Sequence, residues 1–266
     1  MFVDWIYIDE ISMHHPPKAL GQTCLNMFYY GALENAAKVY QVLGEDVMAR
    51  SCMEKREILG KAIKELLYDE EKGMFFEGLN TPTPEHMLYH YMPQNVEKRY
   101  YLKQSNILAA YVGVCGEEKG KEIIHKIMAD EIPGEYQPYF AHFLLEAIYR
   151  NGLRDEYTLK VIEKWKAPIA ECEKGLVEGF LPPEPTYSFD HSHAWGGTPL
   201  YSLPLALMGL KIVEPGLKKL ELNPSLLGLT EARAELPTPY GDVVLELNAG
   251  KEPKITYPKE IQVFMK

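Results

Sequence analysis

Apolar residues recur every three or four positions along most of the chain. Leu20, Cys24 and Met27 begin the first such stripe, which continues to Leu43 and is followed by Gly44. This spacing is typical of an amphipathic helix, and a glycine just past the stripe is a common way for a helix to end. The sequence therefore predicts a first helix from about Leu20 to Leu43.

The same pattern returns further along the chain. Largely apolar stripes stop at Gly113, Gly152 and Gly209, and after the first two a more charged stripe begins at once. Helices that alternate in this way over short turns form αα-hairpins, and their recurrence indicates stacked hairpins. About seven helices are expected from the periodicity. The six after the first are predicted at 45–68, 100–114, 117–129, 139–150, 155–172 and 198–208.

Beyond Gly209 the pattern changes to short apolar or alternating runs between Pro, Gly and Asn-Pro breaks. Such runs are typical of strands. They lie at 217–222, 232–236, 242–247, 254–257 and 261–265. We therefore expect a helical domain over 1–209 and a small antiparallel β-sandwich module over 210–266.

Composition narrows the classes of function. The chain has 266 residues, of which 46% are hydrophobic and 25% are charged, as in an ordinary globular protein. Its net charge of −10 argues against a nucleic-acid or anionic-membrane partner, because either would need a basic surface. No apolar run approaches the length of a membrane span, and Met1 leads into no signal-peptide pattern, so a cytoplasmic protein is expected. The cysteines are widely spaced and are interpreted as reduced core thiols: Cys24, Cys52, Cys115 and Cys172.

The stretch from Gly175 to Pro199 is the strongest candidate for a site. Its Pro and Gly content prevents one long helix, and loops held by a rigid scaffold often carry chemistry. It concentrates acids, imidazoles and aromatics: Glu178, Glu184, Tyr187, Asp190, His191, His193 and Trp195.

Two readings of this stretch stay open from residue types alone. Glu178 is either a functional carboxylate or an exposed loop acid, and His193 either contacts a ligand or packs structurally. His191 and His193 have a spacing that can bind zinc, but the sequence lacks the H-E-x-x-H or Cys-rich pattern of a specific zinc site. No metal is therefore expected.

Short segments spread over the whole chain carry a family resemblance in their order. They are Phe2–Trp5, Leu25–Leu33, Gln137–Phe143, Gly175–Glu178, Ser192–Gly196 and Pro237–Gly241. Together the chain resembles the C-terminal part of bacterial α-L-rhamnosidases, which are inverting glycoside hydrolases of the six-hairpin superfamily. The resemblance implies a mainly α fold, a partial (α/α)6 toroid of αα-hairpins followed by a small antiparallel β-sandwich. It also implies hydrolysis of terminal α-L-rhamnosyl residues of a carbohydrate.

The resemblance assigns roles to particular residues. Glu178 matches the general base, and Asp4, Trp5, His193 and Trp195 match segments that line the sugar site. No cofactor is implied. The family's general acid lies in an upstream Asp- and Arg-rich segment, and none precedes Met1 in this sequence, so the chain is expected to be an incomplete enzyme.

The expected helices make about half of the ring of hairpins, so we expect self-association or pairing with a missing N-terminal half. Two alternatives to the hydrolase remain: a non-catalytic carbohydrate-binding or subunit-interaction remnant, and a six-hairpin glycosidase for another sugar.

Overall fold

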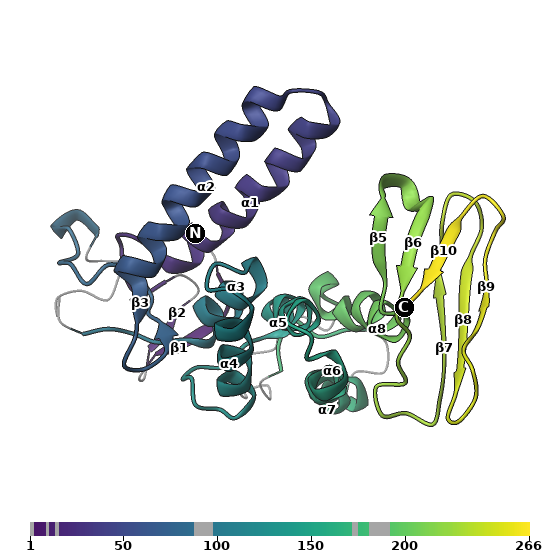
Figure 1. Cartoon of the computed structure of the whole chain (residues 1–266). Coiled ribbons are helices and arrows are strands. Elements are labelled where there is room, and N and C mark those ends of the chain that lie inside the picture. The colour runs from purple at the N-terminus through teal and green to yellow at the C-terminus, as the bar shows by residue number, and fades with distance from the viewer. Residues whose placement is uncertain (1–2, 9–10, 14–15, 88–97, 172–174, 181–191) are drawn as a thin grey trace. The chain divides into compact units, whose positions relative to one another are not determined.

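The structure is a computed structural model that describes residues 3–8, 11–13, 16–87, 98–171, 175–180 and 192–266 (Figure 1). The chain divides into two compact units, Met1–Asn151 and Gly152–Lys266. The predicted domain boundary after residue 209 differs from this division and stays a prediction. No helix in the described part of the chain has the length and hydropathy needed to cross a membrane.

Among its described residues, the first unit has two α-helical hairpins, one further α-helix and the short 3-10 helix η1 (Glu85–Met87). The helices are α1 (Thr23–Val42), α2 (Asp46–Leu67), α3 (Lys103–Val112), α4 (Glu117–Met128) and α5 (Pro138–Arg150). Helix α2 returns along α1, as Figure 1 shows, and Gly60 of α2 allows the close approach. A Cβ at Gly60 would lie 2.8 Å from the Tyr30 ring of α1.

Helices α3 and α5 run parallel. Near their starts, Gln104 Nε2 of α3 donates a hydrogen bond of 2.8 Å to Glu135 O, just before α5. Near their ends, Asn151 Nδ2, just after α5, donates a bond of 3.1 Å to Ala110 O of α3. Since the starts adjoin and the ends adjoin, the two helices point the same way.

Helix α1 is parallel to α3 as well. Cys24 Sγ of α1 lies 3.4 Å from Ser105 Oγ of α3, and a Cβ on Gly31 of α1 would lie 3.1 Å from Val112 Cγ1 of α3. In both contacts the α1 residue and the α3 residue are separated by the same number of positions in the sequence, so the two helices advance in the same direction. Parallel helices joined through antiparallel return helices are the arrangement expected for part of an (α/α)6 toroid, and the predicted fold class is confirmed.

Two short hairpins complete the first unit. Strands β1 (Ile6–Ile8) and β2 (Ile11–Met13) pair antiparallel, as do β3 (Tyr68–Asp69) and β4 (Met74–Phe75). The buried Asn106 side chain fastens β4 to α3, because its Oδ1 accepts from Phe75 N at 2.8 Å and its Nδ2 donates to Phe75 O at 3.0 Å.

The second unit joins helices to two small sheets. Its helical elements are α6 (Arg154–Ile162), η2 (Glu163–Trp165), α7 (Lys166–Glu171), η3 (Ala194–Gly197), α8 (Thr198–Met208) and η4 (Pro215–Leu217). Its strands are β5 (Lys211–Glu214), β6 (Lys219–Leu222), β7 (Glu231–Leu236), β8 (Val243–Asn248), β9 (Lys254–Thr256) and β10 (Gln262–Met265). The sheet orders are β7-β8-β9, all antiparallel, and β10-β6-β5, in which β10 and β6 are parallel.

Strands β6 and β8 each bury one face. Along β8 the side chains of Val243, Leu245 and Leu247 are buried and alternate with more exposed ones, as the two-residue period of a strand requires. A shared core of the end of α8 and the strands holds Ala206, Leu207, Met208, Leu222, Leu227, Ala234, Leu245 and Leu247.

Most predicted helices and all five predicted strands are confirmed, with some differences. The predicted helix 155–172 is divided into α6, η2 and α7, and Pro168 has no N–H to donate to Lys164 O at this point. Strands β1, β2, β3 and β5 were not predicted. Of the four cysteines, Cys24 is buried, whereas Cys52 and Cys115 are partly exposed, and all three are unpaired; Cys172 lies outside the described residues.

Candidate functional site

Asp4 lies at the point where the starts of α3 and α5 meet in the first unit. Its side chain is fully buried. Oδ2 accepts hydrogen bonds from Gln104 Nε2 at 3.0 Å and from Gln137 N, the N-cap residue of α5, at 3.1 Å. Oδ1 accepts from Trp5 N at 3.0 Å. Asp4 therefore fixes the backbone that carries Trp5, whose side chain is partly exposed.

Burial and hydrogen bonding shift the pKa of the Asp4 carboxyl in opposite directions. Loss of hydration raises the pKa of its carboxyl from 3.8 to about 6, and the hydrogen bonds from Gln104, Gln137 and Trp5 limit this rise. The carboxyl is thus mostly ionised at neutral pH, as a group surrounded by N–H donors should be.

Glu77 is a second buried carboxyl in this region, and the sequence alone did not select it. It follows Phe75 and Phe76 and is fully buried. Cys24 Sγ lies 3.9 Å from Glu77 Oε2 and 3.4 Å from Ser105 Oγ. Burial raises the pKa of Glu77 from 4.5 to about 8, so this carboxyl is largely protonated at neutral pH. The signal that could have found it is an acid placed directly after an apolar run.

The raised pKa of Glu77 predicts how stability varies with pH. Between about pH 4.5 and pH 8 the folded state keeps a proton that the unfolded state releases, so the free energy of unfolding falls as the pH rises. The slope contributed by one such proton is at most about 1.4 kcal/mol per pH unit. We expect Glu77→Gln to flatten the profile measured by urea unfolding between pH 5 and pH 8. Asp4, whose pKa is also raised, contributes a slope of the same sign to the remaining profile.

Glu54→Gln is the control for this experiment, since Glu54 is exposed on α2 and its replacement should leave the slope unchanged. A Glu77→Gln protein whose profile is as steep as that of the unchanged chain would contradict the assignment of the buried proton.

The second unit brings three of the predicted site residues together. Trp195 Nε1 donates a hydrogen bond of 3.2 Å to Glu178 O, and the rings of His193 and Trp195 stack with centroids 4.0 Å apart and an interplanar angle of 27°. His193 N donates to Leu176 O at 2.8 Å, so the segment 192–197 lies against the segment that carries Glu178. The Glu178 side chain is partly exposed.

Trp165 packs against both the segment that carries Glu178 and the segment 192–197. Its indole is almost completely buried, and its Nε1 donates to Gly196 O at 2.8 Å. The Trp165 ring also meets Phe180 edge to face at 4.6 Å, so it contacts residues on both segments. Buried His193 Nδ1 has no hydrogen-bond partner among the described residues.

Gly196 permits the close contact between the two segments. A Cβ at this position would lie 2.6 Å from Val177 O and 2.9 Å from Leu176 Cβ, whereas a Cβ at Gly197 would meet only Leu176 Cδ1, at 3.6 Å. We expect Gly196→Ala to lower the free energy of unfolding by about 2 kcal/mol, because the Leu176–Val177 backbone must shift.

Gly197→Ala is the matched control and should change the free energy of unfolding by less than about 0.5 kcal/mol. Chemical unfolding of both variants measures the difference. Equal values for the two alanines would show that the contact at Gly196 is not tight.

Other predicted residues are not placed. Glu184, Tyr187, Asp190 and His191 lie outside the described residues. Asp4 and Trp5 belong to the first unit, and Glu178, His193 and Trp195 to the second. Over the described ranges, no three or more His, Cys, Asp or Glu side chains group in a way that could hold a metal ion.

Chemically, the second unit offers a partly exposed carboxylate segment beside a stacked imidazole and indole. Aromatic faces with a few polar groups are a common way to hold a polar ring-shaped ligand. The first unit offers one ionised and one protonated buried carboxyl near the starts of α1, α3 and α5.

Among the comparisons with known proteins, those with solved structures identify the fold. No protein-family model matches the sequence, and a search of curated proteins finds no match. Among solved structures, the chain is similar to the GH78 family rhamnosidase of Bacillus sp. GL1, with a TM-score of 0.75 and 20% identity over 99% of this chain and 27% of that chain. It is also similar to an α-L-rhamnosidase from Dictyoglomus thermophilum, with a TM-score of 0.68 and 16% identity over 90% of this chain and 26% of that chain.

A third similar structure is a rhamnosidase from Klebsiella oxytoca with rhamnose bound, with a TM-score of 0.58 and 19% identity over 76% of this chain and 35% of that chain. The present chain thus spans about a quarter to a third of the length of these proteins. These likenesses confirm, at the level of the fold, the resemblance carried by the sequence motifs: the chain has the fold of part of a GH78 α-L-rhamnosidase.

Proposed function

We propose that this chain is part of an α-L-rhamnosidase-like inverting glycoside hydrolase, in which Glu178 is the general base. The observation that carries the proposal is the contact of Trp195 Nε1 with Glu178 O beside the stacked His193 ring, in a chain with a rhamnosidase fold. Rhamnose is the sugar bound in the similar Klebsiella oxytoca protein. The ligand class is therefore a neutral glycoside with a terminal α-L-rhamnosyl residue.

An inverting glycoside hydrolysis needs one carboxylate as general base and one carboxylic acid as general acid. The Glu178 carboxylate takes a proton from a water molecule, which attacks the anomeric carbon on the face opposite the leaving group. A carboxylic acid protonates the departing glycosidic oxygen, and such a pair stands about 6.5–9.5 Å apart to leave room for the water. We assign this acid to a part of the protein beyond these 266 residues.

Different observations support the roles proposed for the sugar-lining residues. His193 and Trp195 present a stacked pair next to Glu178, and a buried His193 Nδ1 without a partner in the described chain suits a sugar hydroxyl. Asp4 is fully buried and already accepts three hydrogen bonds, so in this proposal it acts by positioning Trp5, whose ring contacts the sugar.

Hydrolysis of an aryl α-L-rhamnoside tests the proposal. We expect little turnover by the chain alone and clear turnover once the remaining part of the enzyme is supplied, with inversion at the anomeric carbon. A panel of other aryl glycosides separates rhamnose from another sugar. Strong turnover that survives Glu178→Gln would overturn the assignment of the base.

A non-catalytic carbohydrate-binding or subunit-interaction remnant is the second candidate. Large apolar side chains exposed on the described surface, among them Val42, Leu43 and Ile58, favour pairing with another polypeptide. For this candidate, calorimetry should detect L-rhamnose binding that Trp195→Ala abolishes and Glu178→Gln preserves, with no hydrolysis by the reconstituted protein.

A further inference from the structure

A cavity of about 270 Å³ lies between α1, α3 and α5 in the first unit. Its lining combines an aromatic floor, which we define as Phe28, Tyr111 and Phe143, with a charged rim, which we define as Glu34, Lys38 and Arg150. This volume is close to the lower end of small-molecule pockets in proteins. Nothing in the proposed hydrolysis uses these residues.

The cavity is separate from the region around Asp4. Gln104 contacts Asp4 from the first turn of α3, whereas Tyr111 lies seven residues later on the same helix. At 1.5 Å per residue the two positions are about 10 Å apart along the axis of α3. The cavity therefore lies toward the opposite ends of the parallel helices.

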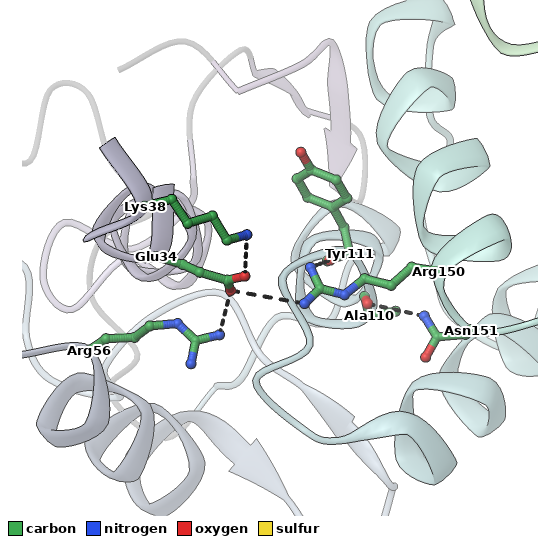
Figure 2. A network of polar contacts seen from close by, with 7 residues as sticks. All are labelled: Glu34, Lys38, Arg56, Ala110, Tyr111, Arg150 and Asn151. Carbon is green, nitrogen blue, oxygen red and sulfur yellow. Dashed lines mark hydrogen bonds and ion pairs between the residues drawn. The ribbon is translucent and has the colours of Figure 1, made fainter. Parts of the chain in front are cut away.

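The rim carries more positive than negative charge, as Figure 2 shows. One carboxylate, Glu34, meets Lys38 Nζ at 2.8 Å, Arg56 Nη2 at 2.8 Å and Arg150 Nη2 at 3.9 Å. These contacts lower the pKa of Glu34, so it is ionised. The rim itself then sums to +1, and Arg56, which does not line the cavity, brings the group around Glu34 to +2. Glu146, which acts electrostatically on Tyr111, leaves an excess of +1 even when ionised, and burial raises its pKa.

This excess is notable in a chain whose net charge is −10. Arg56 is further held by the Tyr30 ring, with its guanidinium carbon 3.9 Å from the ring centroid. Lys38 and Arg150 are the cations that line the cavity itself.

The rim arginine is fixed in place before any ligand binds. Arg150 Nη1 donates a hydrogen bond of 2.9 Å to Tyr111 O at the end of α3, and the neighbouring Asn151 Nδ2 donates to Ala110 O at 3.1 Å (Figure 2). A guanidinium held in this way loses little freedom on binding an anion, and guanidinium groups match carboxylates well.

The floor supplies an apolar surface of aromatic edges and faces. The rings of Phe28 and Tyr111 each lie with their centroids 5.4 Å from that of Phe143, at interplanar angles of 70° and 60°. Phe143 is partly exposed, so the cluster is open toward the cavity rather than sealed in the core. An aromatic ring placed here would add one more edge-to-face contact.

We propose that this cavity binds a small aromatic carboxylate, with the ring on the floor and the carboxylate between Lys38 and Arg150. An aromatic body matches Phe28, Tyr111 and Phe143, and one negative charge offsets the excess positive charge of the rim. The inference does not depend on the rhamnosidase proposal.

Calorimetric titration of the whole chain with sodium benzoate tests the proposal. Benzyl alcohol keeps the ring without the charge, and acetate keeps the charge without the ring. We expect benzoate to bind at least about tenfold more tightly than either, because a charge-assisted hydrogen bond and a buried ring each contribute on the order of 1.4 kcal/mol or more. Acetate binding as tightly as benzoate, or no benzoate binding up to about 20 mM, would overturn it.

Matched variants locate the binding. Arg150→Gln should weaken benzoate binding about tenfold and Lys38→Gln about threefold, by loss of one charged contact. The control is Lys121→Gln, because Lys121 on α4 pairs with Glu117 at 2.8 Å in the same i, i+4 spacing as Lys38 with Glu34, away from the cavity. Lys38 is 64% exposed, so its replacement should not unfold the chain. Equal benzoate affinity in all three variants and the unchanged chain would refute this site.

Discussion

Replacing Glu178 with glutamine should lower kcat for an aryl α-L-rhamnoside by about three orders of magnitude, within the range that general acid–base catalysis contributes. The amide cannot take a proton from the attacking water, whereas its size and the Trp195 Nε1 to Glu178 O contact, which uses the backbone, are kept. KM should therefore change by less than about threefold, because the lost interaction is one made in the transition state. The measurement is steady-state hydrolysis by the chain with the rest of the enzyme supplied.

Glu184→Gln is the matched control, since Glu184 is a carboxylate of the same stretch between two prolines. It should keep kcat within about threefold of the unchanged protein. If Glu184→Gln abolished turnover and Glu178→Gln did not, the general base would be Glu184 and the proposed role of Glu178 would be wrong.

Replacing Gly209 with alanine should lower the free energy of unfolding by about 3 kcal/mol, the sum of backbone strain and overpacking. Gly209 follows α8 with φ of +58°, a conformation that residues with a Cβ rarely adopt. A Cβ there would lie 2.0 Å from Asn223 O and 2.3 Å from Arg154 Nη1. The clash is costly because Arg154 Nη1 donates to Asn223 O at 2.8 Å and Asn223 N donates to Met208 O at 3.1 Å, so neither neighbour is loose.

Gly216→Ala separates strain from overpacking. Gly216 belongs to the same unit and has φ of +80°, but a Cβ there would meet no atom within 4 Å. It should cost about 1 kcal/mol, for backbone strain alone. Urea unfolding of both variants gives the difference, and a Gly209→Ala protein no less stable than Gly216→Ala would show that the packing around Asn223 yields easily.

The apolar spacing predicted the helices well because glycine residues mark several of their C-terminal ends in the sequence. The predicted stops at Gly44, Gly113, Gly152 and Gly209 all have positive φ in the structure. Strand β5 escaped prediction because all four of its side chains are exposed, so no apolar alternation marks it. The division of 155–172 was missed because the apolar spacing continues through it, and the break signal given by Pro168 was not used.

The candidate site could be predicted only in part. Its stretch and the residues Glu178, His193 and Trp195 stand out from residue types and motif order, and their contacts with one another needed the fold. Glu77 stayed hidden because a glutamate is ordinarily exposed, and its burial depends on α1 and α3 meeting over β4. The charged rim was hidden for a similar reason, since Arg150 of α5 reaches Glu34 of α1 from far away in the sequence.

By itself, then, the sequence determined the helices, five of the strands, the family resemblance of the fold and the stretch that holds Glu178. These depend on periodicity, on helix-ending glycines and on motif order, which are local or ordered along the chain. Only the tertiary structure decided which carboxyls are buried, which cations surround Glu34, and that Gly196 lets His193 and Trp195 pack against the Glu178 segment. The physical reason is that hydration, pKa and steric fit depend on atoms brought together from distant segments, which no local pattern records.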